Sequence, residues 1–101
     1  MDEPLFVYGS LRDQQVQSEI IGRIVEGTPD VLLGYGTSTI TIENNVYPIL
    51  VPVANGIVEG EILEVSKEEL NAIDVYESDE YRRVKVKLKS GTEVWVYSTS
   101  D

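Results

Sequence analysis

The sequence contains neither cysteine nor histidine, and these two absences exclude much of the common catalytic and metal-binding chemistry. Without cysteine there is no disulfide, no thiolate metal ligand and no cysteine nucleophile. Without histidine there is no Ser-His-Asp triad and no imidazole ligand for a metal ion. Any acid or base in this protein must therefore be a carboxylate, a tyrosine, a lysine or a chain terminus.

Basic residues are scarce: 8 Lys and Arg stand against 18 Asp and Glu, which gives a net charge of -10. A charge of this sign repels nucleic-acid phosphates and anionic lipid headgroups. Apolar runs are short, and none approaches the ~18 residues that a membrane span requires. We therefore expect neither nucleic acid nor membrane as a partner. The acidic start Met-Asp-Glu-Pro is unlike a basic signal peptide and favours a cytoplasmic location.

The residues that are present suffice for one hydrophobic core. A chain of 101 residues that is 42% hydrophobic and 26% charged has the size and composition of an ordinary globular domain. No repeat, low-complexity tract or linker interrupts it. We expect a single domain over residues 1–101.

The first part of the chain predicts a strand, a tight turn and a helix. The apolar run Pro4–Tyr8 stops at Gly9, which is typical of a buried strand that enters a turn. After Asp13, apolar residues recur at four-residue spacing as far as Ile24, which indicates an amphipathic helix. We expect the apolar side of this helix to lie on a sheet.

The rest of the chain predicts short strands and a second helix. Ser66 and Glu69 form a capping box, which begins a helix over about residues 67–74. A turn is expected at Asn44-Asn45, and a hairpin turn at residues 89–92. Further strands are predicted within 27–36, 39–42, 46–52 (at an edge or bulge, because of its two prolines), 58–65, 81–88 and 93–98.

About seven short, mostly antiparallel strands in so small a chain must protect their edges, and closure into a barrel does this most completely. We therefore predict an α+β fold, a small mostly antiparallel β-barrel with two flanking helices.

The turn Tyr8-Gly9-Ser10-Leu11 is the first place where chemistry is expected. A strand that breaks at glycine exposes consecutive backbone N–H groups, and these can hold an anion such as a carboxylate without a basic side chain. The alternative is a plain strand-end turn with a buried tyrosine.

Asp74 and Glu77 are the second candidate. Carboxylates three residues apart share one face of a helix, and a glutamate placed among aromatic residues has its pKa raised by desolvation, which makes it a usable acid or base. The alternative is a solvated acidic face, because nine of the eighteen acidic residues lie between Glu59 and Glu80.

Two other patterns have a structural explanation. Lys85, Lys87 and Lys89 alternate with apolar residues as the wet face of a strand, which explains them better than a phosphate site does. Trp95 and Tyr97 share one face of the last strand, as a core aromatic pair does. The carboxylates lack the spacing of an oxygen-ligand loop, so no metal is predicted, and no pattern calls for a cofactor.

The order of these motifs along the chain resembles the gamma-glutamyl cyclotransferase-like (AIG2-like) family. The resemblance runs from Phe6 to about Tyr97 and rests on Tyr8-Gly9-Ser10-Leu11 after the first strand, Tyr47-Pro48, Val58-x-Gly60-Glu61-Ile62 before the capped helix, and the pattern Asp74-x-Tyr76-Glu77-x3-Tyr81-x-Arg83. Ser78 stands where the family commonly has glycine, and the loops that would recognise the leaving half of a substrate are short.

The resemblance implies a small β-barrel enzyme that cyclises a gamma-glutamyl amine or peptide to 5-oxoproline and releases the free amine. By this resemblance Glu77 is the general acid/base, and the glutamyl moiety is held by the loop Tyr8, Gly9, Ser10 and Leu11, with Tyr47 and Tyr81 as further substrate-binding residues. A small gamma-glutamyl compound is then the partner. Two alternatives remain: a non-catalytic small-molecule binding module of the same fold, and a purely structural interaction domain.

Overall fold

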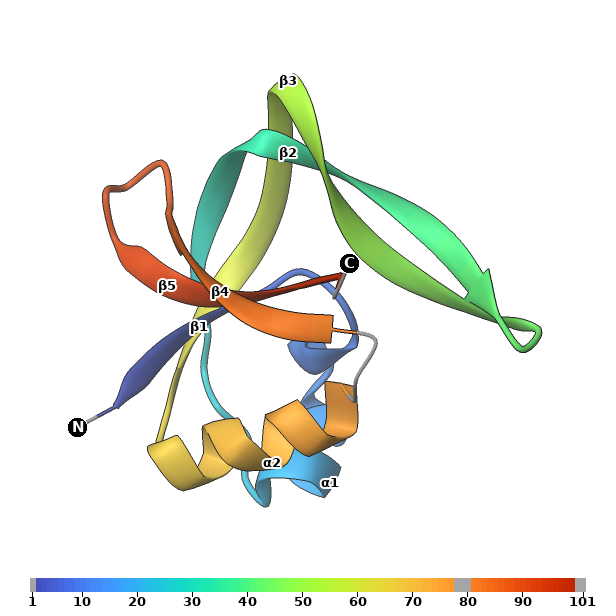
Figure 1. Cartoon of the computed structure of the whole chain (residues 1–101). Helices are drawn as coiled ribbons and strands as arrows, with labels where there is room; N and C mark the ends of the chain where they lie inside the picture. Colours follow the sequence, from blue (N-terminus) through green and yellow to red (C-terminus); the bar gives the residue numbers. More distant parts are fainter. Residues whose placement is uncertain (1, 78–80, 100–101) are drawn as a thin grey trace.

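The computed structural model describes residues 2–77 and 81–99, apart from the side chains of Ser10, Ile42, Tyr47 and Thr99. Along the chain the elements are β1 (Glu3–Val7), the 3-10 turn η1 (Ser10–Arg12), α1 (Gln14–Ile21), β2 (Thr28–Ile42), β3 (Asn45–Val65), α2 (Lys67–Glu77), β4 (Tyr81–Lys87) and β5 (Glu93–Thr99). In Figure 1 both helices lie on the same side of the curved sheet, and the far halves of β2 and β3 extend away from it as a two-stranded arm.

The strands form one mixed sheet in the order β2-β3-β1-β5-β4. β1 runs parallel to β5, and the other neighbouring pairs are antiparallel. The α+β class is therefore confirmed, but the predicted closed barrel is wrong, because β2 and β4 remain as two edges. A backbone hydrogen bond of 2.8 Å from Lys89 N to Val31 O joins the turn after β4 to β2. This bond ties the two edges at a single point.

The long strands β2 and β3 replace four of the shorter strands that were predicted. Their register shifts between Leu33 and Tyr35, around Gly34, whose φ of +85° is accessible to glycine at low cost. The two-stranded ribbon continues through this bulge, so β2 remains one strand on both sides of Gly34. Residues 45–52 of β3 lie outside the register with β1 and pair with β2, in agreement with the edge position predicted for its prolines.

The tip of the arm is a two-residue turn, one position earlier than predicted. Glu43 and Asn44 both have positive φ, 51° and 69°, as the tight hairpin turn that matches strand twist requires. Asn45 is already paired with Ile42.

Helix α1 is shorter than its apolar spacing predicts. The Asp13 side chain accepts a hydrogen bond of 2.8 Å from Gln15 N, which caps the helix start. The helix ends at Gly22, whose φ of 87° gives a left-handed cap with its N–H bonded to Ser18 O. Ile24 therefore lies beyond the helix and is 56% exposed, so its predicted place in the apolar stripe is wrong.

Helix α2 begins with the predicted capping box. Ser66 N donates to Glu69 Oε1 (2.8 Å), and Glu69 N donates to Ser66 Oγ (3.1 Å). The same Glu69 carboxylate accepts from Arg23 Nε at 2.6 Å, which links α2 to the segment after α1. The helix continues to Glu77, three residues further than predicted.

The core is divided between the two faces of the sheet. Because side chains alternate along a strand, Trp95 and Tyr97 share one face of β5 and Val94 and Val96 the other, as predicted. The helix side is built mainly from buried residues of the sheet and of α2: Leu5, Val7, Leu63, Val65, Leu70, Ile73 and Tyr97. The concave side holds Phe6, Leu32, Leu50, Val58, Ile62, Leu88, Val94 and Val96.

Candidate functional site

Glu77 is the last residue of α2, and its carboxyl is half-buried. The two residues before it, Val75 and Tyr76, are 81% and 40% exposed, so they occupy the outer side of the helix. Burial raises the pKa of Glu77 to about 7, because desolvation disfavours the charged carboxylate. This carboxyl therefore exchanges a proton near neutral pH, as an acid/base must.

Tyr8 connects the turn after β1 to the sheet beside α2. Its hydroxyl donates a hydrogen bond of 2.9 Å to the Tyr97 carbonyl. The pKa of Tyr8 is raised by burial first, and then by the neighbouring Tyr81 and Glu77. Tyr8 is thus a neutral hydrogen-bonding group at physiological pH, close enough to Glu77 for the carboxylate charge to act on it.

The arm of β2 and β3 reaches the same region through Pro48. The hydroxyl of Tyr81, the first residue of β4, donates a hydrogen bond of 2.6 Å to the Pro48 carbonyl. On the other side, a methyl group placed on Gly9 would lie 3.7 Å from Pro48 Cγ. Pro48 therefore lies near both Gly9 and Tyr81, which are 72 residues apart in sequence.

The structure thus gathers four of the seven predicted site residues: Tyr8, Gly9, Glu77 and Tyr81. The side chain of Leu11 is buried in the helix-side core, so it can serve a site only through its backbone. The side chains of Ser10 and Tyr47 lie outside the described part of the structure, as does Ser78. The roles of all seven residues stay predictions.

A polar network beside Glu77 was missed as a unit by the sequence patterns. Asp74 lies one helical turn before Glu77. Its Oδ1 accepts a hydrogen bond of 2.6 Å from the Tyr97 hydroxyl and one of 2.7 Å from Arg83 Nε. Its Oδ2 accepts a hydrogen bond of 2.9 Å from Arg83 Nη2. The Arg83 guanidinium also lies 4.7 Å from the centre of the Trp95 ring. The sequence feature that pointed to this network was the three-residue spacing of Asp74 and Glu77.

Gln17 is a second residue that the patterns missed. It is 1% exposed in α1. Its Nε2 donates a hydrogen bond of 2.8 Å to Leu11 O, and its Oε1 accepts a hydrogen bond of 2.8 Å from Val25 N. It therefore satisfies backbone groups on both sides of α1 and holds η1, which follows directly on Gly9. A single glutamine among polar helix residues carries no sequence signal for this role.

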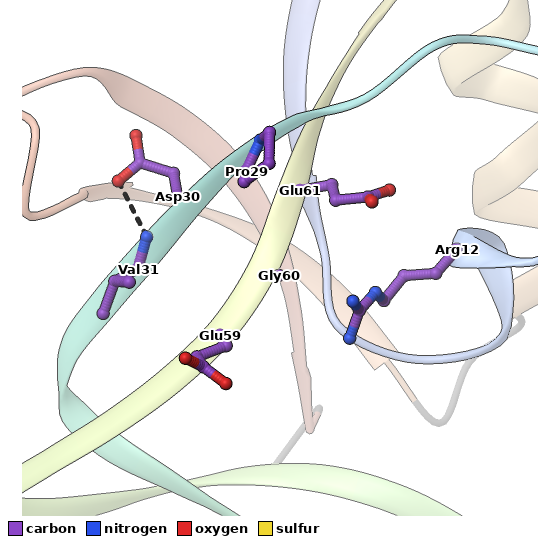
Figure 2. Close-up of a pocket in the computed structure, with 7 residues that line it drawn as sticks. All are labelled: Arg12, Pro29, Asp30, Val31, Glu59, Gly60 and Glu61. Carbon is purple, nitrogen blue, oxygen red and sulfur yellow. Dashed lines mark hydrogen bonds between the residues drawn. The ribbon is translucent and has the colours of Figure 1, made fainter.

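A cleft of about 330 Å³ lies elsewhere, across β2 and β3. In Figure 2 Arg12 extends from η1 towards this cleft, while Glu59 and Glu61 project from β3. The lining residues are Arg12, Pro29, Asp30, Val31, Glu59, Gly60 and Glu61. None of them is a predicted site residue.

The described part of the chain has neither a cluster of metal-binding side chains nor a helix that could span a membrane. Over residues 2–77 and 81–99, no group of three or more acidic side chains is arranged to hold a metal ion. Within the same ranges, neither helix has the length and apolar character to cross a bilayer.

Comparison with known proteins gives a consistent result. Residues 5–101 match the model of the family described as gamma-glutamyl cyclotransferase, AIG2-like. Protein AIG2 C of Arabidopsis thaliana is 36% identical over 102 residues, which cover 91% of this chain and 61% of that protein. This chain thus spans about three-fifths of the length of that relative.

Solved structures show the same fold. A solution structure of an Arabidopsis thaliana protein, 31% identical, superposes with a TM-score of 0.81 over 99% of this chain and 63% of its own. A structure named gamma-glutamyl cyclotransferase, only 17% identical, shares the fold with a TM-score of 0.78 over 100% of this chain and 68% of its own. From the match over residues 5–101 and the similarity to AIG2 C, we conclude that the chain belongs to the gamma-glutamyl cyclotransferase, AIG2-like, family.

Proposed function

We propose that this protein is a gamma-glutamyl cyclotransferase, which converts a gamma-glutamyl amine or peptide to 5-oxoproline and the free amine, with Glu77 as general acid/base. The observation that carries the proposal is the half-buried Glu77 carboxyl, with a pKa raised to about 7, beside Tyr8 at the end of β1. Family membership supports the class of reaction.

The raised pKa suits the first proton transfer. The substrate's α-amino group is an ammonium at neutral pH, with a pKa of about 8. A glutamate of ordinary pKa, 4.5, is a poor acceptor for this proton, whereas a carboxyl with a pKa of about 7 is closely matched to the donor. Glu77 takes the proton and frees the amine for attack.

The remaining steps need no further catalytic group. The free α-amine attacks the γ-carbonyl carbon of the same molecule and closes a five-membered ring, a step favoured by holding the chain in a folded conformation. The bond from the γ-carbon to the departing nitrogen then breaks. Protonated Glu77 donates its proton to this nitrogen, and the carbonyl of the ring re-forms as the amine leaves. The Glu77 carboxylate then takes the extra proton from the ring nitrogen and passes it to the released amine, so the products are 5-oxoproline and an ammonium ion, and the carboxylate is restored.

The turn after β1 supplies the anchor for the substrate. The backbone N–H groups that follow Gly9 open a 3-10 turn, closed by a 3.0 Å bond from Arg12 N to Gly9 O. N–H groups at such a start point outward and favour a carboxylate. Binding the substrate's α-carboxylate here presents its amine towards Glu77.

The deciding experiment compares wild type with Glu77→Gln on a panel of gamma-glutamyl amines and peptides, with 5-oxoproline as the readout. The variant keeps the shape of the side chain but cannot accept the proton. We expect turnover to fall about 10²- to 10⁴-fold, with substrate binding by calorimetry retained. The matched control is Glu68→Gln, an exposed glutamate in the first turn of the same helix.

The results separate the enzyme from a binding module of the same fold. Full activity in Glu77→Gln would overturn the assignment of Glu77. Binding of gamma-glutamyl compounds by wild type without any 5-oxoproline formation would instead favour the binding module.

A further inference from the structure

Asp74 is held by the sheet through three hydrogen bonds from two strands. Tyr97 on β5 supplies one donor and Arg83 on β4 supplies two, at 2.6 to 2.9 Å. Arg83 approaches Asp74 through two nitrogens and both carboxylate oxygens, the two-pronged geometry that fixes direction as well as distance. Asp74 is thereby the point at which the last turn of α2 is fastened to the sheet.

Tyr97 contacts both halves of the proposed site. Its hydroxyl donates to Asp74 on α2, and its backbone carbonyl accepts from the Tyr8 hydroxyl after β1. Tyr97 thus determines the separation between Tyr8, which precedes Gly9, and the end of α2. Tyr97 is buried in the core between these contacts, which restricts its movement.

Glu77 follows Asp74 by three residues, so the two carboxyls lie on neighbouring positions of one helical face. The exposed side of this turn is taken by Val75 and Tyr76. Any rotation of the last turn that freed Asp74 from its donors would therefore move Glu77 as well. The contacts of Asp74 fix the orientation of both residues.

We infer that Asp74, Arg83 and Tyr97 form a positioning network that fixes the last turn of α2 and sets where the Glu77 carboxyl lies relative to the Tyr8-Gly9 turn. This inference rests on the proposed function of Glu77. The three are positioning residues, since they act on the reaction through Glu77.

The network also balances charge next to Glu77. The phenols of Tyr8 and Tyr97 are close enough to this carboxyl to feel its charge, Tyr81 adjoins Tyr8, and the Arg83 guanidinium is bonded to Asp74. An unpaired Asp74 would repel the Glu77 carboxylate, but Arg83 neutralises it. Removing either member of this ion pair leaves the other charge unpaired beside the last turn of α2.

The test therefore uses the two ends of the ion pair. In Asp74→Asn the Arg83 charge is uncompensated and stabilises the Glu77 carboxylate, so the Glu77 pKa falls by about half a pH unit. In Arg83→Met the Asp74 charge is uncompensated, and the pKa of Glu77 rises by about the same amount. An ion pair that does not act on Glu77 would leave the Glu77 pKa unchanged in both variants.

The Glu77 pKa is read by NMR titration of carboxyl-labelled protein, with the resonance assigned by its absence in Glu77→Gln. The acidic limb of kcat/KM should follow the same opposite shifts. Lys85→Met is the matched control: Lys85 is on the same strand and lies 4.8 Å from the same Trp95 ring. It should leave the Glu77 titration and the activity unchanged.

Tyr97→Phe keeps the ring and the backbone carbonyl and removes only the donor to Asp74. We expect kcat to fall about tenfold, with KM within twofold, because a displaced base slows chemistry more than binding. If Asp74→Asn or Arg83→Met fails to fold, the kcat of Tyr97→Phe still tests the positioning network. Thermal unfolding identifies that case.

The outcomes distinguish this inference from the proposed function. An unchanged kcat in Tyr97→Phe, or the absence of titration shifts in both Asp74→Asn and Arg83→Met, overturns the positioning network. Absence of 5-oxoproline from wild type overturns the proposed reaction, and the NMR titration still decides the network. Opposite shifts of the Glu77 pKa in the two ion-pair variants, together with a reduced kcat in Tyr97→Phe, support both the positioning network and the proposed reaction.

Discussion

The hydroxyl of Tyr81 donates a hydrogen bond of 2.6 Å to the backbone carbonyl of Pro48, across a sequence separation of 33 residues. This bond fastens the β2–β3 arm to the start of β4. Pro48 is also the neighbour of Gly9, so the bond holds one side of the proposed substrate site. A proline within β3 has no N–H to offer its neighbouring strand, but its carbonyl remains an acceptor.

Tyr81→Phe should loosen the arm without unfolding the protein. One hydrogen bond contributes about 0.5–1.5 kcal/mol, so the free energy of unfolding should fall by no more than about 1.5 kcal/mol. We expect KM for gamma-glutamyl substrates to rise several-fold, because the wall of the site becomes mobile. Urea denaturation and steady-state kinetics measure the two effects. The control is Arg82→Gln, the exposed neighbour on β4; an unchanged KM in Tyr81→Phe would contradict the placement of Tyr81 at the site.

Gly9→Ala should separate ligand contact from folding. Gly9 has no positive φ, and the added methyl would lie in ordinary contact with Pro48 at 3.7 Å. The variant should therefore be within about 1 kcal/mol of wild type in stability. If a substrate approaches this backbone closely, the methyl should raise KM about tenfold or more. The measurements are urea unfolding and KM for a gamma-glutamyl amine.

Gly60→Ala is the contrasting case for that experiment. There the added methyl would collide with Val7 O and would lie 2.7 Å from the Phe6 ring, so the backbone of β1 must move. We expect Gly60→Ala to destabilise the fold, whereas Gly9→Ala spares it. Equal destabilisation by both would show that Gly9 is required for folding rather than for contact with a ligand.

Glu77 should make the protein less stable as pH rises. Below pH 4.5, its ordinary pKa, the carboxyl is protonated in both folded and unfolded chains. Between 4.5 and about 7 the unfolded chain releases the proton first, so unfolding becomes easier; above 7 the cost is constant. Glu77→Gln should therefore exceed wild type in stability by less than about 0.5 kcal/mol near pH 5. At pH 8 it should be more stable by on the order of 1 to 2 kcal/mol, after allowance for solvent screening.

The same titration governs activity. Because the base acts in its ionised form, kcat/KM should fall about tenfold for each pH unit below 7. Urea denaturation at pH 5 and 8 and a pH–rate profile check both statements. Greater stability of wild type than of Glu77→Gln at pH 8 would mean that a partner stabilises the carboxylate, against the burial argument.

Gln17→Leu should destabilise the protein by about 2–4 kcal/mol, since it leaves the carbonyl of Leu11 and the N–H of Val25 buried without their partner. Leucine fills similar space, so the loss reflects the hydrogen bonds. Hydrogen exchange at Val25 N–H should accelerate specifically. Gln15→Leu, at an exposed position of the same helix, is the control and should change stability by less than about 0.5 kcal/mol.

Local patterns predicted the features that depend on near neighbours. The capping box of Ser66 and Glu69 is confirmed because its two hydrogen bonds join residues three apart. The sides of β5 are confirmed because side-chain alternation is a property of any strand. The gaps predicted at residues 37–38 and 53–57 are wrong, because β2 and β3 run through them, and local patterns do not show how far a strand continues.

The candidate site illustrates the limit of such patterns. Its parts, Tyr8-Gly9 and Glu77, were found by their order along the chain and by family resemblance. The bonds that assemble them join Tyr8 to Tyr97, Tyr81 to Pro48 and Asp74 to Arg83. Each of these needs a specific strand order or helix position, which sequence periodicity leaves undetermined.

By itself the sequence determined the α+β class, the start of α2, the faces of β5 and the exclusion of histidine and cysteine chemistry, because each depends on composition or on residues within one turn. Only the tertiary structure decided that the sheet stays open, that Gln17 is buried as a clamp, and that burial raises the pKa of Glu77 to about 7. These properties arise from water excluded and hydrogen bonds made between distant segments, which come into contact only when the chain has folded.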